Sequence, residues 1–135
     1  MNPLNPEPIA ELLIVDDSPV VLHLLSQMLM RLNFKVRPAS CGELALQEAR
    51  IQPPDLILLD INMPGMNGYE VCQRLKADES LKAIPVIFIS SLDEAIDKTK
   101  GFEAGGADYI TKPFQFEDVM ARVRIHLAQR RQQCQ

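Results

Sequence analysis

Short apolar stretches alternate along this chain with longer segments in which apolar residues recur every three to four positions. The apolar stretches occupy residues 12–15, 34–37, 56–59, 86–89 and 109–110. Most of them consist largely of valine, isoleucine, leucine and phenylalanine, which is typical of strands that are covered by helices on both faces. The pattern therefore predicts five buried strands.

The segments between the strands carry helix-capping signals followed by apolar residues at helical spacing. The capping signals are Ser18-Pro19, a capping box at Ser40 to Glu43, Asn67 with Glu70, and Asp93. The predicted inward faces include Leu24 in the first helix, Phe102 in the fourth and Phe116 in the fifth. Five strand–helix units predict a parallel sheet with helices on both of its faces.

Polar residues follow the predicted strands, and the carboxyl ends of parallel strands meet at one edge of a sheet. Asp16 and Asp17 follow the first strand, Asp60 the third, Ser90 the fourth and Lys112 the fifth. Three clustered carboxylates repel one another unless a cation neutralises them, and Mg²⁺ prefers such oxygen ligands. Lys112 can add a positive charge for a phosphate oxygen, and Ser90 a hydrogen bond. Together they predict a phosphoryl-transfer site with an aspartate nucleophile.

Composition narrows the class of protein. The chain has 135 residues, of which 47% are hydrophobic and 24% charged, as in one globular domain. A net charge of −4 argues against a nucleic-acid binder that acts through bulk positive charge. No apolar run approaches the roughly 18 residues that span a bilayer, and the proline-containing residues 1–10 predict a flexible arm rather than a signal peptide. Cys41, Cys72 and Cys134 include no CxxC pair, which favours reduced thiols in a cytoplasmic protein.

Four motifs together resemble the receiver domains of two-component response regulators, including the single-domain chemotaxis regulators. The motifs are LLIVDDSP, ILLDINMPGMNG, VIFISS and DYITKPF, and the resemblance covers about residues 11–128. It implies an α/β fold that is flavodoxin-like and doubly wound, with a five-stranded parallel sheet in the order 2-1-3-4-5 and five helices. Residues 129–135 would then be a polar helical tail or the start of a linker to an effector domain.

The resemblance also implies the phosphoryl site. Asp60 would be the phosphoacceptor. Asp16, Asp17 and Asp60, with the backbone carbonyl of Asn62, would hold Mg²⁺ or Mn²⁺. The side chains of Asn62 and Leu92 would tune the lifetime of the phosphate.

A conformational switch is implied by the same resemblance. Ser90 and Lys112 would contact the phosphate, and Tyr109 would swing inward on activation. The peptide bond before Pro113 would be cis, which is uncommon among X–Pro bonds in general.

These features predict a phosphorylation-activated receiver that accepts a phosphoryl group from a histidine kinase or a histidine phosphotransfer protein and dephosphorylates itself. It would be a signalling domain rather than an enzyme, and its fourth and fifth helices could form a dimer.

One alternative is a Mg²⁺-dependent aspartyl phosphohydrolase, but such enzymes need a carboxylate two residues after the nucleophile, where Asn62 stands. Another is a flavin- or nucleotide-binding domain, which needs a phosphate-binding loop where Asp16 and Asp17 stand. The kinase, the stimulus and the output stay open.

Overall fold

The central feature of the fold is one parallel five-stranded sheet. The computed structural model describes residues 8–91 and 98–133. The strands, hydrogen-bonded in the order β2-β1-β3-β4-β5, are β1 (Glu11–Val15), β2 (Lys35–Ala39), β3 (Leu56–Asp60), β4 (Val86–Ser91) and β5 (Asp108–Lys112). The predicted doubly wound α/β fold and its strand order are confirmed.

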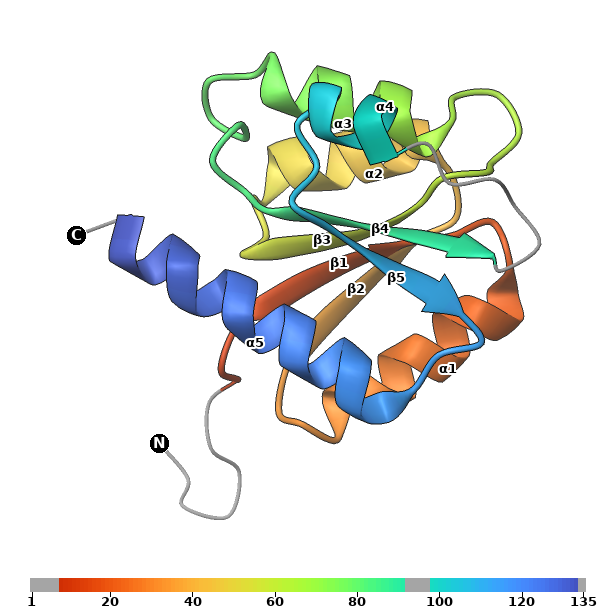
Figure 1. Cartoon of the computed structure of the whole chain (residues 1–135), viewed down its shortest axis with the longest axis vertical. Coiled ribbons are helices and arrows are strands. Elements are labelled where there is room, and N and C mark those ends of the chain that lie inside the picture. Colours follow the sequence, from red (N-terminus) through yellow and green to blue (C-terminus); the bar gives the residue numbers. More distant parts are fainter. Residues whose placement is uncertain (1–7, 92–97, 134–135) are drawn as a thin grey trace.

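Helices cover both faces of the sheet. They are α1 (Pro19–Met30), α2 (Gly42–Ile51), α3 (Gly68–Lys76), α4 (Lys98–Glu103) and α5 (Phe116–Gln133). Helices α1 and α5 lie on one face, and α2, α3 and α4 lie on the other (Figure 1). The cap expected at Asp93 lies outside the described residues. In the part of the chain that the structure describes, we find no helix long and apolar enough to cross a membrane.

Two hydrophobic cores form because successive strand residues point to opposite faces. In β1, Leu13 and Val15 join the core under α2, α3 and α4, whereas Leu12 and Ile14 join the core under α1 and α5. All four side chains are fully buried. Each buried aliphatic side chain contributes about 1.5–3 kcal/mol, so the continuous apolar run of β1 fixes the middle of the sheet.

Two of the predicted helix caps form, and one does not. The Ser18 side chain accepts a backbone N–H at the start of α1, and Asn67 and Glu70 form a reciprocal capping box at the start of α3. The box predicted at Ser40 to Glu43 is wrong. The N-cap of α2 is Cys41, whose side chain makes no capping hydrogen bond. A thiol is only a weak acceptor, so α2 begins without this support.

Three residues expected to face inward are instead exposed. Phe102 is 59% exposed, Leu24 51% and Phe116 39%, so these parts of the predicted stripes are wrong. Helix α4 has only six residues, and the small residues Gly101 in it and Ala104 directly after it are the ones buried against the core. Helical spacing marks an apolar stripe, but the width of the buried strip depends on what packs against it.

Both ends of the described chain contact the domain. The Ile9 N–H donates to the carbonyl of Asn33, and the Lys35 N–H donates to the carbonyl of Ala10, so this part of the predicted arm is bonded beside β2. Helix α5 continues to Gln133, which makes residues 129–133 helical. The division into an arm, a receiver domain and a tail stays a prediction.

Candidate functional site

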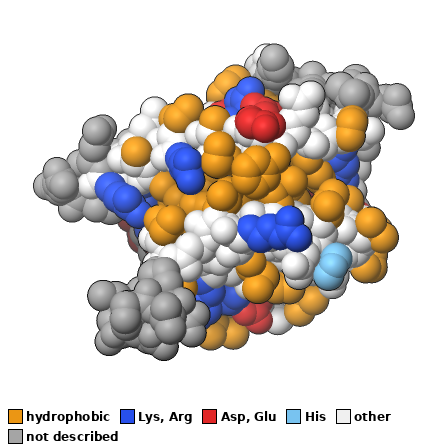
Figure 2. All heavy atoms as spheres, turned by 90° about the horizontal axis from the view of Figure 1, so that it is seen from below, with side chains coloured by type: hydrophobic (Ala, Val, Ile, Leu, Met, Phe, Trp, Pro, Cys, Tyr) orange, Lys and Arg blue, Asp and Glu red, His pale blue; other side chains and the backbone are white. Residues whose placement is uncertain are grey.

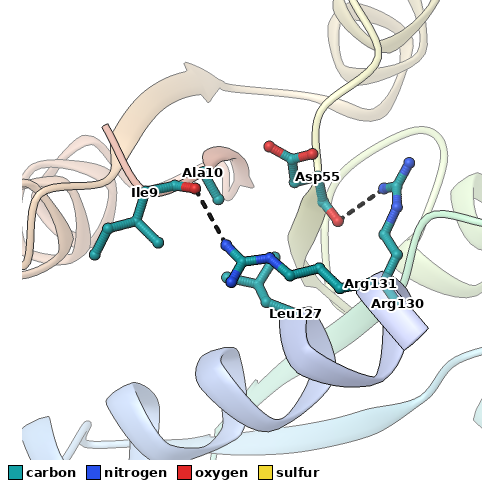
Figure 3. A pocket seen from close by; sticks show the side chains of 6 residues that line it. All are labelled: Ile9, Ala10, Asp55, Leu127, Arg130 and Arg131. Carbon is teal, nitrogen blue, oxygen red and sulfur yellow. Dashed lines mark hydrogen bonds between the residues drawn. The ribbon is translucent and has the colours of Figure 1, made fainter. Parts of the chain in front are cut away.

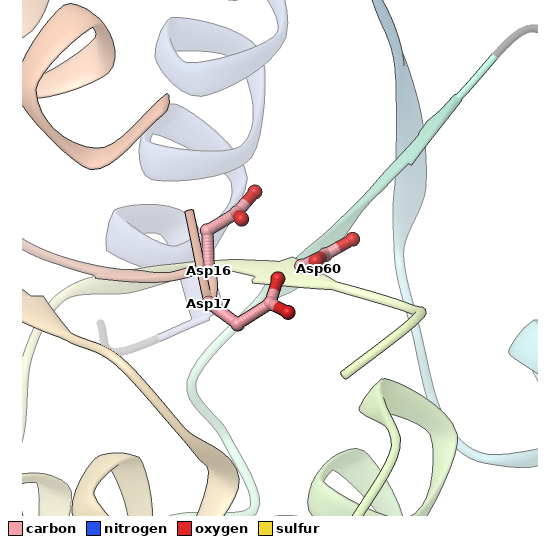
Figure 4. A group of neighbouring side chains, drawn as sticks. All are labelled: Asp16, Asp17 and Asp60. Carbon is pink, nitrogen blue, oxygen red and sulfur yellow. The ribbon is translucent and has the colours of Figure 1, made fainter. Parts of the chain in front are cut away.

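Strand register brings the predicted carboxylates together. Val15 of β1 pairs with Leu59 of β3, so the next residues, Asp16 and Asp60, lie side by side at the carboxyl edge of the sheet. Asp17 follows directly. Carboxylate oxygens of the three aspartates lie within 4.8 Å of one another, and Figure 4 shows the three side chains at the ends of these adjacent strands.

Lys112 is the cation that the fold places against this cluster. It ends β5, and its Nζ lies 3.1 Å from Asp16 Oδ2 and 3.9 Å from Asp60 Oδ1. The peptide bond between Lys112 and Pro113 is cis. Asp16 and Asp60 are both buried, so one ammonium group faces two carboxylates that water hardly reaches.

The environment of Asp60 disfavours its charged form. Burial, followed by the negative charges of Asp16 and Asp17, raises the pKa of Asp60 from 3.8 to about 7, although Lys112 and the backbone N–H of Asn62 oppose the rise. A bound cation would reverse this effect, because positive charge favours the ionised carboxylate. A cation therefore competes with the proton on Asp60, and its binding strengthens as the pH rises through about 7.

The donor set fits a small divalent cation. Asp16 Oδ1 accepts the Ser18 N–H at 2.9 Å. Asp16 Oδ2 is buried and receives no hydrogen bond from any described residue, so its charge is offset by the Lys112 ammonium group. Opposite ligands of Mg²⁺, each bound at about 2.1 Å, lie about 4.2 Å apart, which is close to the observed spread of carboxylate oxygens. Asp17 is exposed and leaves room for bound water.

Ser90 lies in β4 near the same edge. Asp60 pairs with Ile89, so Ser90 is one residue closer to the carboxyl end. Its side chain is buried, with 1% of the residue exposed, and its hydroxyl donates to the carbonyl of Ser91 at 3.4 Å. Asn62 is exposed after β3, and Leu92 lies outside the described residues.

Tyr109 packs within an aromatic group around Phe88 of β4, which lies two residues before Ser90 and therefore on the same face of the sheet. Its half-buried ring lies 5.4 Å from Phe88 and meets Phe102 edge-on at 6.3 Å, measured between centroids. Sequence reasoning missed Gly101, where a Cβ would lie 1.8 Å from the Tyr109 hydroxyl oxygen. A glycine inside a helical segment was the available signal, because glycine there is costly without a packing reason.

Comparison with known proteins agrees with this geometry. Residues 12–124 match the family model of the response regulator receiver domain. The chain belongs to this family. The family works in phosphorylation-based two-component signalling, in which a receiver carries an aspartyl phosphate and interacts with a histidine kinase or a phosphotransfer protein. Receiver domains typically bind Mg²⁺, and the acidic cluster of this receiver could hold such an ion.

Similar sequences include receivers alone and receivers within longer regulators. Protein PilH of Pseudomonas aeruginosa is 39% identical, and the match covers 88% of this chain and 98% of PilH. The DNA-binding dual master transcriptional regulator RpaA of Synechocystis is 42% identical over 86% of this chain. The chain spans 48% of RpaA and 25% of the response regulator PleD of Caulobacter vibrioides.

Solved structures show the same fold. A response regulator from Chloroflexus aurantiacus superposes with a TM-score of 0.85 and 36% identity, covering 90% of this chain and 99% of its own. The chemotaxis protein CheY4 of Vibrio cholerae superposes with a TM-score of 0.81 and 28% identity, covering 85% of this chain and 96% of its own. Receiver domains are signalling domains, and the enzymatic parts of longer relatives such as PleD are other domains of those proteins.

Proposed function

We propose that this receiver accepts a phosphoryl group on Asp60 in a Mg²⁺-dependent reaction. The observation that carries the proposal is the cluster of three aspartate carboxylates within 4.8 Å, with the Lys112 ammonium group beside two of them. An Asp60 oxygen forms a bond to phosphorus, while the bond from phosphorus to the donor imidazole nitrogen breaks. The donor is a phosphorylated histidine kinase or histidine phosphotransfer protein.

The charges of the site have separate tasks in this proposal. Asp16, Asp17, Asp60 and the backbone carbonyl of Asn62 would hold Mg²⁺ or Mn²⁺, which would supply positive charge to the phosphoryl oxygens. Lys112, whose Nζ lies 3.1 Å from Asp16 and 3.9 Å from Asp60, would contact another phosphoryl oxygen. Preorganised charge of this kind is the main contribution that proteins make to phosphoryl transfer.

Phosphorylation is proposed to change the packing around β4. The Ser90 hydroxyl leaves the carbonyl of Ser91 and donates to the phosphoryl group, and Tyr109 moves into the space that the following loop vacates. Charge-assisted hydrogen bonds contribute about 1.5–3 kcal/mol each, and about 5.5 kcal/mol moves a two-state equilibrium from mostly off to mostly on. Two or three new contacts are therefore enough to drive the switch.

The receiver is also proposed to end its own signal. Water attacks the phosphorus of the Asp60 phosphate, and inorganic phosphate leaves, at a rate that Asn62 and Leu92 tune. The exposed Asn62 amide can orient that water. It cannot transfer a proton as the carboxylate of an aspartyl phosphohydrolase does, so hydrolysis stays slow and serves signalling.

The phosphodonor is proposed to dock on the layer formed by α1 and α5. Val20 and Leu24 on α1 are 75% and 51% exposed, and Phe116 at the start of α5 is 39% exposed. A hollow lined by Leu24, Met28 and Phe116 joins the two helices, and Figure 2 shows hydrophobic side chains gathered on this face. Both helices begin a few residues after site residues, so a docked donor reaches Asp60.

The proposal has three further parts: a dimer, an effector domain and a cellular location. A dimer can form through α4 and α5, where Phe102 and Ile125 are 59% and 54% exposed. An effector domain can follow α5 in a longer protein. A cytoplasmic location agrees with Cys41 and Cys72, which are free thiols, whereas Cys134 lies outside the described residues.

The assignment of Asp60 is tested with acetyl phosphate and Mg²⁺. We expect the wild-type receiver to gain about one phosphoryl group per chain, and Asp60→Asn to gain none, because an amide is not a nucleophile for phosphorus at neutral pH. Intact-protein mass spectrometry measures the added mass directly. Glu79→Gln is the control, because the Glu79 side chain is 87% exposed. Full labelling of Asp60→Asn would place the acceptor elsewhere.

A further inference from the structure

A second polar cavity lies at the opposite edge of the sheet, where the strands begin. It has a volume of ≈ 240 Å³ and is lined by residues before β4 and β5, by the end of α3 and by the C-terminal half of α5. In Figure 1 this is the region between the last turns of α5 and the loop that joins α3 to β4. Four basic side chains line it, namely Lys76, Lys82, His126 and Arg130. We call it the basic pocket.

Lys76 is fixed in this pocket by neutral groups. Its Nζ donates to the carbonyl oxygens of Lys82 at 3.0 Å and Ile84 at 2.6 Å. An ammonium group has three N–H donors, so one donor remains for a further acceptor. Because both acceptors are carbonyls, the positive charge of Lys76 is held in place without being neutralised.

Arg130 is fixed in the same way. Its Nη1 donates to the carbonyl oxygens of Pro54 at 3.1 Å and Asp55 at 2.8 Å. Figure 3 shows this side chain reaching from α5 to the backbone at Asp55. Arg130 lines the basic pocket and also the neighbouring cavity beside Ile9 and Asp55, and a guanidinium fork matches phosphate oxygens well.

The acidic groups around the pocket already have partners. One Asp108 oxygen lies 2.5 Å from Arg122 Nη1, and the other lies 2.9 Å from His126 Nε2. Glu79 contacts Lys82 at 2.8 Å, but its side chain is 87% exposed, and such surface ion pairs are weak and screened by salt. Neither carboxylate neutralises Lys76 or Arg130.

The positive charges of Lys76 and Arg130 also repel each other. Burial lowers the pKa of Lys76, and the positive charge of Arg130 lowers it further, against an opposing effect of Cys72. Two like charges that are held near one cavity are stabilised by an anion between them. This relation mirrors the three aspartates at the other edge of the sheet, which are stabilised by a cation.

We propose that the basic pocket binds a dianionic phosphate group, either inorganic phosphate or the phosphate of a small monoester. Lys76 comes from α3, Lys82 from the segment between α3 and β4, and Arg130 from α5, so a tetrahedral group with several oxygens meets them better than a planar carboxylate does. The volume of ≈ 240 Å³ is several times the about 30 Å³ that a water molecule occupies in the liquid. It accommodates a phosphate group and part of an ester substituent.

The proposal is tested by titrating the full chain with sodium phosphate at constant ionic strength, with a chelator present, in ¹H–¹⁵N NMR spectra. We expect saturable shifts of the backbone amides of Ala83, Ala107 and Gln129, which line the pocket. Adenosine monophosphate is titrated in parallel. Tighter binding of the monoester identifies an organic phosphate as the ligand, and equal or weaker binding identifies inorganic phosphate. Shifts confined to Asp17, Asn62 and Lys112 would overturn the proposal.

Two variants remove charge from the pocket. Arg130→Gln and Lys82→Gln are each expected to weaken phosphate binding at least fivefold. Lys82→Gln keeps the test valid if Arg130→Gln fails to fold, because the Lys82 side chain is 53% exposed. Lys35→Gln is the matched control, since it removes one exposed positive charge from β2, outside the pocket. Equal weakening by Lys82→Gln and Lys35→Gln would show unspecific charge attraction and overturn the proposal.

Discussion

Asp60 is a carboxylate that the fold holds where a negative charge is unfavourable. Only 3% of the residue is exposed, and Asp16 and Asp17 add negative charge beside it. Lys112 offsets part of this charge, from 3.9 Å away. The charged carboxylate of Asp60 lowers the stability of the folded protein. The same arrangement favours binding of a cation and reaction with a phosphoryl group, because both relieve the repulsion among the three carboxylates.

The raised pKa of Asp60 predicts a pH-dependent stability in the metal-free protein. The pKa is about 7 in the folded protein and 3.8 for an ordinary aspartate, so folding favours the protonated form. This contribution is complete below pH 3.8 and is lost as the pH rises to about 7, with an upper bound of about 4 kcal/mol. Asp60→Asn stays neutral, so we expect its free energy of unfolding to rise relative to wild type between pH 4.5 and 8.

Urea unfolding in the presence of a chelator, at several pH values, measures this difference. Glu79→Gln serves as the control, and its difference from wild type should stay nearly flat. Excess Mg²⁺ should shrink the advantage of Asp60→Asn at pH 8, because the cation stabilises the ionised carboxylate of the wild type. A difference between Asp60→Asn and wild type that does not change with pH would show that Asp60 is not perturbed as described.

Helices α1 and α5 cover one face of the sheet and also carry apolar residues that face solvent. Their inward residues, such as Leu25 and Val123, are fully buried, while Leu24 and Phe116 beside them face solvent. Both helices begin close to the carboxyl edge of the sheet, since α1 follows Asp17 and α5 follows Lys112 by a few residues. One layer thus presents an apolar surface next to the phosphoryl site.

Leu24→Glu is expected to slow phosphotransfer from the cognate kinase about tenfold, which corresponds to about 1.4 kcal/mol of lost contact. Labelling by acetyl phosphate should be unchanged, because this small donor needs no docking surface. The two rates are compared with radiolabelled kinase and by mass spectrometry. Ile51→Glu is the control, since Ile51 is 77% exposed at the end of α2, on the other face. Equal slowing by both variants would argue against docking on α1.

The whole molecule carries opposite charges at the two edges of one sheet. The acidic cluster lies where the strands end, and the basic pocket lies where β4 and β5 begin. A net charge of −4 conceals this division. Ligands of opposite sign at the two edges would each stabilise the folded state, since each one relieves repulsion that exists only in that state.

Mg²⁺ is expected to stabilise the folded receiver by about 2.7 kcal/mol at a concentration 100 times its Kd. Asp17→Asn should remove most of this gain. Its own fold should persist, because Asp17 is exposed. Thermal unfolding with MgCl₂, compared with NaCl at equal ionic strength, measures the effect. If Asp17→Asn kept the full gain from Mg²⁺, Asp17 would not be a ligand.

The sequence by itself determined the strand–helix order and the edge at which Asp16, Asp60 and Lys112 gather, because apolar periodicity and strand polarity are local properties. Only the tertiary structure decided which apolar residues are buried, as the exposed Leu24 and Phe102 show. It also decided the basic pocket, whose residues come from segments distant in the chain. Burial and charge proximity depend on what packs opposite, and no local pattern records that.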